Sequence, residues 1–543
     1  MRASRHMELQ TAPHSRKFAV AVLVVFGLGL ALRLPTFLRP MLSDDEAIYA
    51  TTADALGRGD LLYRDVVDHK PPLIYHLYQA GFALCGRYDT QGAHLLVVLA
   101  VLLTAGLLLA IGAGEKASRR EGLAAAGLFL CFSTTWHDYD ALAANCELFL
   151  LLPQALAAWL LLRDLRAPAR GARGAGVHLA VGALIGASAL FKYQGLTFLG
   201  ASIGMLLWWS APARAPRRSR YWAVARAGCH LGGALAPFAL YLVACRAAGN
   251  AEAAVYWLRF NFSYVGAGLT GGAALARGLR RAALVGGAAL VPYALGLAGA
   301  VAVARKVTGV LRRRSDRAAA EAPAPSAVLA LLWLATSTVA VSAGGRFFGH
   351  YFHLILPPLC LLAAPGFCRL WNARRSFRLA LAVLCALPAL LFFALASFAR
   401  PLAARLDERQ PPYDEVAARI DQLTRPDQRI FIWGNSPQLY VLARRPLGTR
   451  FSFCNYLTGE SPGTPTETGA RNADGNQLPA AWTMLFDDLE RRRPALLVDA
   501  AAAGWDGYGK YPLARYPRLR DYVERHYRLL ETDAGVVLYR RLP

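Results

Sequence analysis

Long apolar stretches alternate with short polar connections along the first 400 residues of the chain. Most of these stretches approach the roughly 20 residues that a helix needs to cross the hydrocarbon core of a membrane. The chain is therefore expected to be an α-helical polytopic membrane protein. The pattern predicts eleven transmembrane helices, at residues 18–34, 94–113, 122–136, 148–162, 177–191, 196–210, 228–245, 282–304, 326–343, 351–365 and 379–398.

Two shorter features complete this part of the chain. Residues 18–34 follow a basic segment and are followed by Pro35 and Arg39 rather than by a small-residue cleavage site, so we expect an uncleaved first transmembrane helix. Residues 73–85 are too few and too mixed to span a membrane comfortably, and they follow two prolines, which helices accept near their first turn. We expect an interfacial helix there.

The pattern changes after residue 399. Short apolar runs at residues 429–433, 495–498 and 536–539 are typical of strands, and residues 413–423 and 482–491 have helical spacing. The sequence therefore predicts two parts. They are a transmembrane region, residues 1–399, with an acidic first outer loop at 35–92, and a small α/β domain, residues 400–543.

The charge of the chain changes this picture little. It has 60 Lys and Arg residues against 36 Asp and Glu, a net charge of +24. Such an excess indicates nucleic-acid binding when the basic residues share one soluble face. Here most of them lie between apolar stretches, so membrane lipids, and no nucleic acid, are the expected partners. The nine cysteines include no C-x-x-C pair, which argues against a disulfide scaffold or a zinc site.

The polar connections fall into two alternating sets. One set is short and basic, and the positive-inside rule places it in the cytoplasm together with the N-terminus. The other set and the C-terminal domain then face outward. The Ala-, Arg- and Gly-rich composition indicates a bacterial protein, and hence a cytoplasmic (inner) membrane. The basic connections are at residues 116–120, 163–173, 214–220, 305–317 and 369–378.

Nearly every candidate reactive side chain belongs to the outward set, which predicts an active site at the outer face. The densest group is an acidic stretch at residues 42–72 that ends in His-Lys-Pro-Pro. The candidates are Asp44, Asp45, Glu46, Tyr49, His69, Lys70, Asp140, Glu147, Lys192, Arg346, His350 and Tyr351.

The carboxylates have both a structural and a chemical interpretation. Ser43 followed by Glu46 is a capping box, and acids in the first turn of a helix are favoured by its dipole. This favours a structural role for Glu46. A capping box does not require the two acids between, which favours a functional Asp45 and leaves Asp44 open. Asp140 and Glu147 flank the start of a span, where acids also serve as helix caps.

The cations also have two interpretations. Two prolines stiffen the backbone behind Lys70, which suits a phosphate presented at the membrane plane. Lys70 and Lys192 could instead extend their ammonium groups to lipid headgroups. Arg346 could clamp a phosphate or meet the interface.

Several of these motifs together resemble the GT-C superfamily. They are Asp45-Glu46 and Tyr49 after the first span, His69-Lys70-Pro71-Pro72, Asn145-Cys146-Glu147, and Arg346 with His350-Tyr351 and Leu356-Pro357-Pro358. Within that superfamily the chain is similar to bacterial members of the protein O-mannosyltransferase and aminoarabinose-transferase group, glycosyltransferase family 39. The resemblance covers roughly the first 400 residues.

The resemblance implies a transferase that moves a sugar from a polyprenyl-phosphate carrier to an acceptor on the outer face. It implies that Asp45 is the catalytic carboxylate and that Lys70 binds the donor's phosphate. The residues suit that chemistry, because a carboxylate can take the acceptor's proton. Lys70, helped by Lys192 or Arg346, can stabilise the departing phosphate. A divalent cation held by Asp44, Asp45 and His69 is a further hypothesis.

The rival hypothesis is a transporter or flippase for lipid-linked or anionic solutes, which would use the same charges without bond chemistry. Transporters usually have repeat symmetry and polar groups near mid-membrane. The charges of this chain gather at one face instead, which favours the enzyme. A catalytically silent relative that only binds lipid phosphate is a third alternative. The acceptor, whether lipid, glycan or protein, is not specified by the sequence.

Overall fold

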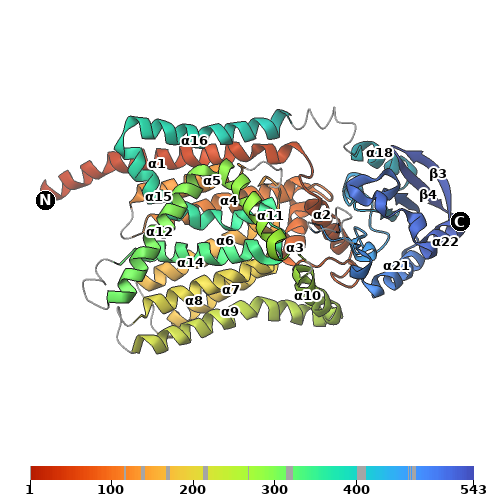
Figure 1. Cartoon of the computed structure of the whole chain (residues 1–543), viewed down its shortest axis with the longest axis horizontal. Helices are drawn as coiled ribbons and strands as arrows, with labels where there is room; N and C mark the ends of the chain where they lie inside the picture. The colour runs from red at the N-terminus through yellow and green to blue at the C-terminus, as the bar shows by residue number, and fades with distance from the viewer. Residues whose placement is uncertain are drawn as a thin grey trace.

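The computed structural model describes residues 2–543 except 115–117, 136–140, 167–170, 212–217, 267, 314–321, 400–410, 463, 465 and 467–471. Up to residue 399 the chain forms a bundle of helices with similar directions, and the C-terminal domain packs at one end of it (Figure 1). The bundle helices are α1 (Arg2–Arg33), α4 (Gln91–Gly112), α5 (Arg119–Phe132), α6 (Cys146–Arg166), α7 (Gly171–Phe191), α8 (Thr197–Trp209), α9 (Arg218–Ala248), α12 (Leu290–Arg313), α14 (Pro325–Ser342), α15 (Leu356–Ala373) and α16 (Arg375–Ala394).

Among the described residues, eight helices are long and apolar enough to cross a membrane: α1, α4, α6, α7, α9, α12, α14 and α16. This confirms the predicted fold class of a polytopic helical membrane protein. The three other predicted spans correspond to α5 and α8, which are shorter, and to α15, which is less apolar. All three pack within the same bundle, α5 against α4 and α15, and α8 against α14.

The predicted span at 282–304 is wrong in its first residues. The structure has two helices there, α11 (Gly271–Ala288) and α12, separated at Ala289, whose φ of −113° and ψ of 43° are not helical. Gly286 and Gly287 weaken helix formation just before this break. α11 and the preceding α10 (Ala251–Gly266) are therefore additional helices between α9 and α12.

Two short helices, α2 (Asp44–Gly57) and α3 (Leu73–Cys85), lie at the end of the bundle that meets the C-terminal domain (Figure 1). The bounds of α3 are those predicted. It packs closely on the start of α4, because Gly81 and Gly92 have no side chains: a Cβ on Gly81 would lie 2.7 Å from the backbone nitrogen of Ala93. This contact fixes α3 against the start of α4.

Arg33, at the end of α1, fixes the segment before α6. Its side chain is buried and donates hydrogen bonds to the carbonyls of Ser133 at 3.2 Å and Ala141 at 2.9 Å. Thr36, in the short 3-10 turn Leu34–Leu38, donates to the carbonyl of Leu142 at 2.9 Å. The chain on both sides of residues 136–140 is thus attached to the end of α1, which positions the N-terminus of α6.

The C-terminal domain contains a four-stranded sheet in the order β1-β2-β4-β3. The strands β1 and β2 are parallel, and the other neighbours are antiparallel. The three strands and two helices predicted from the sequence are present, whereas β3, α19, α20 and α22 were not predicted. Buried and exposed residues do not alternate regularly along β3, so this strand lacks a clear period of two. The elements are α18 (Tyr413–Leu423), β1 (Ile430–Trp433), α19 (Gln438–Leu442), α20 (Asn455–Thr458), α21 (Pro479–Arg492), β2 (Leu496–Asp499), α22 (Pro517–His526), β3 (Tyr527–Asp533) and β4 (Val536–Arg541).

The C-terminal domain and the loop between α2 and α3 are joined by backbone and side-chain contacts. Val67 donates its backbone N–H to the carbonyl of Arg450 at 3.0 Å, forming an isolated bridge with Phe451. Arg492 donates to the carbonyl of Asp65 at 2.7 Å. The division predicted after residue 399 adjoins residues 400–410, which lie outside the described part of the chain, and it remains a prediction.

Candidate active site

The first turn of α2 carries the central carboxylate. Ser43 is the N-cap of α2, and its hydroxyl accepts the backbone N–H of Glu46 at 3.4 Å, as the capping-box interpretation requires. Asp45 accepts a hydrogen bond from the ammonium of Lys70 at 2.7 Å through Oδ1, and one from the hydroxyl of Tyr49 at 3.2 Å through Oδ2. The Lys70 Nζ also lies 4.7 Å from the centre of the Tyr49 ring.

The local environment keeps Asp45 ionised. Burial alone would raise the pKa of its carboxyl, but the positive charges of Lys70, His350 and Lys192 outweigh burial and lower the pKa to about 2. Burial would lower the pKa of Lys70, and Asp45 and Asp68 reverse that effect and raise it. Each member of the pair therefore holds the other in its charged form.

A second ion pair lies beside the first. Lys192, which follows α7, donates to the carboxylate of Glu147 in the first turn of α6. The Nε2 of His350 is 3.9 Å from the same carboxylate, and the Lys192 Nζ lies 4.1 Å from the centre of the Tyr351 ring. His350 and Tyr351 belong to a 3-10 segment, Gly349–Leu354, that precedes α15.

The two ion pairs form one cluster. The thiol of Cys146 donates to the hydroxyl of Tyr49 at 3.4 Å and so connects the start of α6 with α2. His350 and Lys192 also act electrostatically on Asp45. The structure therefore brings together seven residues that the sequence singled out from four separate connections: Asp45, Tyr49, Lys70, Glu147, Lys192, His350 and Tyr351.

Glu46 has a different role from Asp45. Its side chain is fully buried and accepts backbone N–H groups from Leu42 at 2.5 Å and Ala144 at 2.6 Å, and it contacts the Nε2 of His94 at 3.0 Å. One carboxylate thus joins the chain before α2, the chain before α6, and α4. These contacts agree with the structural role predicted for Glu46, although its side chain caps neighbouring segments rather than Ser43.

Asp44, Asp45 and His69 have partners of different kinds. Asp44 is exposed and accepts a hydrogen bond from Gln438 of the C-terminal domain at 2.6 Å, and His69 Nδ1 lies 3.1 Å from the hydroxyl of Tyr456. Within the described ranges, no three His, Cys, Asp or Glu side chains are grouped so that they could hold a metal ion. These residues do not form a cation site as they stand, and the predicted divalent cation stays a prediction.

The two remaining predicted residues are Arg346 and Asp140. Arg346 is buried and donates to the carbonyl of Pro462 at 3.0 Å and to the hydroxyl of Ser461 at 2.8 Å, so it binds the C-terminal domain. Asp140 lies outside the described residues.

Three residues of this region were not singled out by the sequence. The first two are Asp68 and Tyr456: Asp68 is fully buried and accepts hydrogen bonds from Tyr75 at 2.7 Å and from Tyr456 at 3.2 Å. The third is Gln438, which donates to Asp44. Asp68 stands directly before His69-Lys70, which was a usable signal. Tyr456 and Gln438 lie almost 400 residues further along the chain, and no local pattern marks them.

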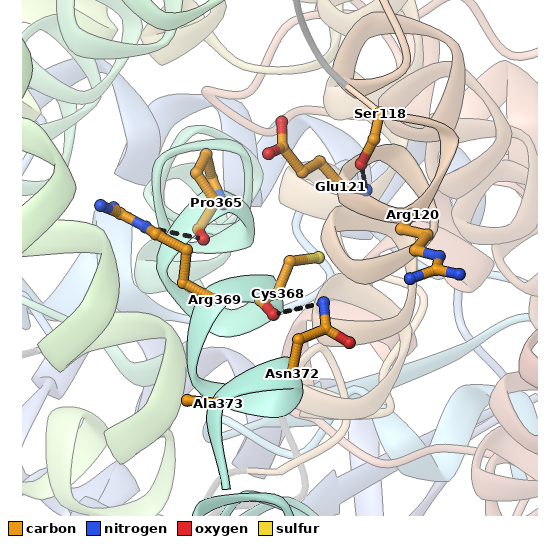
Figure 2. A pocket seen from close by; sticks show the side chains of 8 residues that line it. All are labelled: Ser118, Arg120, Glu121, Pro365, Cys368, Arg369, Asn372 and Ala373. Carbon is orange, nitrogen blue, oxygen red and sulfur yellow. Dashed lines mark hydrogen bonds between the residues drawn. The ribbon is translucent and has the colours of Figure 1, made fainter.

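An open groove of about 550 Å³ lies between the first turn of α5 and the last turns of α15 (Figure 2). Ser133, which follows α5, and the 3-10 segment before α15 lie at the opposite ends of these two helices. The groove is therefore far from the cluster. Arg369 donates to the carbonyl of Pro365 at 3.2 Å and Asn372 donates to that of Cys368 at 2.9 Å. These two polar side chains thus bind the backbone of their own helix, and we place the candidate site at the cluster.

The chain resembles known proteins in sequence over part of its length and in fold over nearly all of it. The family model described as dolichyl-phosphate-mannose-protein mannosyltransferase matches residues 69–228, which include Lys70, Glu147 and Lys192. A search of curated proteins finds no significant match.

Two solved structures are similar over nearly the whole chain. ArnT from Cupriavidus metallidurans, bound to undecaprenyl phosphate, is 16% identical with a TM-score of 0.58 and covers 98% of each chain. The archaeal oligosaccharyltransferase AglB from Archaeoglobus fulgidus, in complex with an inhibitory peptide and a dolichol-phosphate, is 13% identical with a TM-score of 0.55. It covers 97% of this chain and 74% of its own. The chain therefore has the fold of the GT-C superfamily, as its motifs indicated.

Proposed function

We propose that this GT-C protein is a membrane glycosyltransferase that transfers a sugar from a polyprenyl-phosphate donor to a hydroxyl or similar nucleophile of an acceptor. One observation carries the proposal: a partly open carboxylate, Asp45, is paired with Lys70 at 2.7 Å beside a second pair, Glu147 and Lys192. Carboxylate and ammonium groups at one place suit a reaction that removes a proton and releases a phosphate.

The donor's phosphate would compete with Asp45 for Lys70. In the ion pair, a carboxylate with a pKa of about 2 is a weak base. A phosphate that draws the ammonium of Lys70 toward itself removes the main stabilising charge, so the pKa of Asp45 rises and the carboxylate becomes a better proton acceptor. Donor binding therefore prepares the base for the acceptor's proton.

The transfer itself needs one bond exchange. The acceptor oxygen attacks the anomeric carbon while the bond from that carbon to the phosphate oxygen breaks, and the acceptor's proton passes to Asp45. The charge that develops on the departing polyprenyl phosphate is stabilised by Lys70, with Lys192 nearby. A positioned carboxylate base contributes about 10²–10⁴-fold to such a rate.

Two findings support the donor class. The matched family model is described by a lipid-phosphate sugar, and both similar structures hold a polyprenyl phosphate. With the basic connections in the cytoplasm, the cluster and the C-terminal domain would face the outside of a bacterial cytoplasmic membrane. The acceptor could then be a lipid, a glycan or a protein of the cell envelope.

The experiment uses the purified chain in sealed lipid vesicles with a panel of polyprenyl-phosphate sugars and acceptors. It measures the release of free polyprenyl phosphate by the wild type, Asp45→Asn and Lys70→Ala. We expect release by the wild type, about 10²–10⁴-fold slower release by Asp45→Asn with donor binding retained, and weakened donor binding by Lys70→Ala. Movement of intact carrier between leaflets without any release would overturn the enzyme and favour a transporter.

A further inference from the structure

The segment that carries Lys70 is held by two nearby tyrosines and by one residue from a distant part of the chain. Tyr63 donates its hydroxyl to the carbonyl of Lys70 at 2.7 Å, and Asn261 of α10 donates to the carbonyl of His69 at 2.9 Å. Tyr75 of α3 donates to the carboxylate of Asp68 at 2.7 Å. Residues 68–70 are thus fixed residue by residue, as a group that must meet a phosphate in one position requires.

The C-terminal domain supplies another of these contacts. Tyr456, in the short helix α20, directs its hydroxyl at both Asp68, with an O–O distance of 3.2 Å, and the Nδ1 of His69, at 3.1 Å. Asp68 is completely buried, so its carboxylate depends on such hydrogen bonds in place of water. Burial would raise the pKa of Asp68, but the charges of His69 and Lys70 and the hydrogen bonds from His69 and Tyr75 lower it.

The ring of Tyr456 is itself held on several sides. Its centre lies 4.9 Å from that of Trp257 and 5.8 Å from that of Phe260, both in α10, and 5.3 Å from that of Phe453. Only 6% of the residue is exposed. A ring packed in this way has little rotational freedom, so its hydroxyl keeps a fixed direction.

We propose that Tyr456 is a positioning residue of the transferase, through which the C-terminal domain sets the place of Lys70 and hence the affinity for the donor's phosphate. The inference rests on the proposed function and deepens it. It makes the C-terminal domain part of the donor site, since the contact reaches Lys70 through Asp68 and His69.

The test is Tyr456→Phe, which removes the hydroxyl and keeps the packed ring. Tyr440→Phe is the matched control, because Tyr440 is a fully buried tyrosine of the same domain whose hydroxyl accepts the backbone N–H of Ile432 at 3.0 Å. Both variants lose one buried tyrosine hydroxyl, and only one of these hydroxyls contacts the Lys70 segment.

Binding of polyprenyl phosphate in nanodiscs is measured first, followed by KM for the donor and for the acceptor. We expect Tyr456→Phe to weaken polyprenyl-phosphate binding and raise the donor KM by about tenfold, the effect of one hydrogen bond to a charged group. The acceptor KM and the Tyr440→Phe values should stay at the wild-type level. In a Lys70→Ala background, Tyr456→Phe should have no additional effect on binding.

The outcomes separate the two proposals. If the wild type binds polyprenyl phosphate and Tyr456→Phe binds it equally well, the positioning role is wrong while the transferase remains. If Tyr440→Phe weakens binding as much as Tyr456→Phe, the effect is a general loss of stability, and the positioning role is again wrong. If the wild type neither binds nor releases polyprenyl phosphate, the proposed function itself fails.

Discussion

Two polar clusters in the described part of the bundle differ in what surrounds them. The first is the candidate site, where Asp45 keeps 28% of its side chain exposed and Lys70 9%. The second lies between four helices: His178 of α7 contacts Asp164 of α6 at 3.1 Å and His230 of α9 at 2.8 Å, and His230 contacts Ser202 of α8 at 3.2 Å.

Access distinguishes the two clusters. His178, His230 and Ser202 are completely buried, and Asp164 is 4% exposed. Their polar atoms bind one another across four helices, which stabilises the packing of those helices and keeps these side chains away from solvent. Charged groups at the candidate site are paired as well. Asp45 is partly exposed, however, so a substrate can reach its ion pair with Lys70 and replace one partner. An ion pair inside a protein is therefore weak evidence of catalysis by itself. The exposure of the pair distinguishes a catalytic role from a structural one.

The largest effect on stability is expected within the candidate site. Glu147→Gln leaves the ammonium of Lys192 without its carboxylate, and breaking one partner of a buried pair costs about 3–5 kcal/mol. The double variant Glu147→Gln, Lys192→Met removes both charges and should recover much of that loss in thermal unfolding while turnover stays low. Recovery of turnover together with stability would show that the second pair is only structural.

In the four-helix cluster, we expect a substitution to lower stability without changing the reaction. His178→Phe keeps an aromatic ring, although a larger one, and removes both hydrogen bonds of the imidazole, so we expect a loss of about 1–3 kcal/mol in the free energy of unfolding. The donor KM and kcat of the folded fraction should not change. A shift in donor KM at unchanged stability would contradict the structural role of this cluster, because it would place the cluster in the reaction.

The ion pair of Asp45 should also give a pH dependence of stability. Its pKa of about 2 lies below the ordinary value of roughly 3.9. A lowered folded-state pKa stabilises the fold above the unfolded value, and that contribution is lost as the pH falls through about 2. The difference in unfolding free energy between the wild type and Lys70→Gln, up to about 2 kcal/mol, should therefore shrink between pH 5 and pH 2. A constant difference over that range would contradict the pairing.

The smallest effect is expected where the C-terminal domain meets an exposed acid. Gln438→Ala removes the hydrogen bond to Asp44, whose side chain can bind water instead, so the cost should be below about 1 kcal/mol. Thermal unfolding checks this value, and acceptor KM checks whether the contact also shapes the second substrate site. A loss as large as that of Glu147→Gln would mean that Asp44 is more than a surface contact.

Local patterns were sufficient for much of the fold. The bounds of α3 and α18 follow from apolar periodicity, and Ser43 marks the start of α2 because its hydroxyl can cap only the residues that follow it. The break between α11 and α12 was missed because apolar residues continue across it, and hydropathy does not record a change in backbone direction.

The sequence by itself determined that the chain is a helical membrane protein, which charged residues lie between its spans, and which carboxylate and ammonium groups could do chemistry. Only the tertiary structure decided that Lys70 pairs with Asp45, that Arg346 binds the C-terminal domain, and that Tyr456 reaches Asp68. The physical reason is the range of the forces. Periodicity and capping act over a few residues, whereas these contacts join segments 25 to 388 residues apart, whose meeting depends on the packing of the whole bundle.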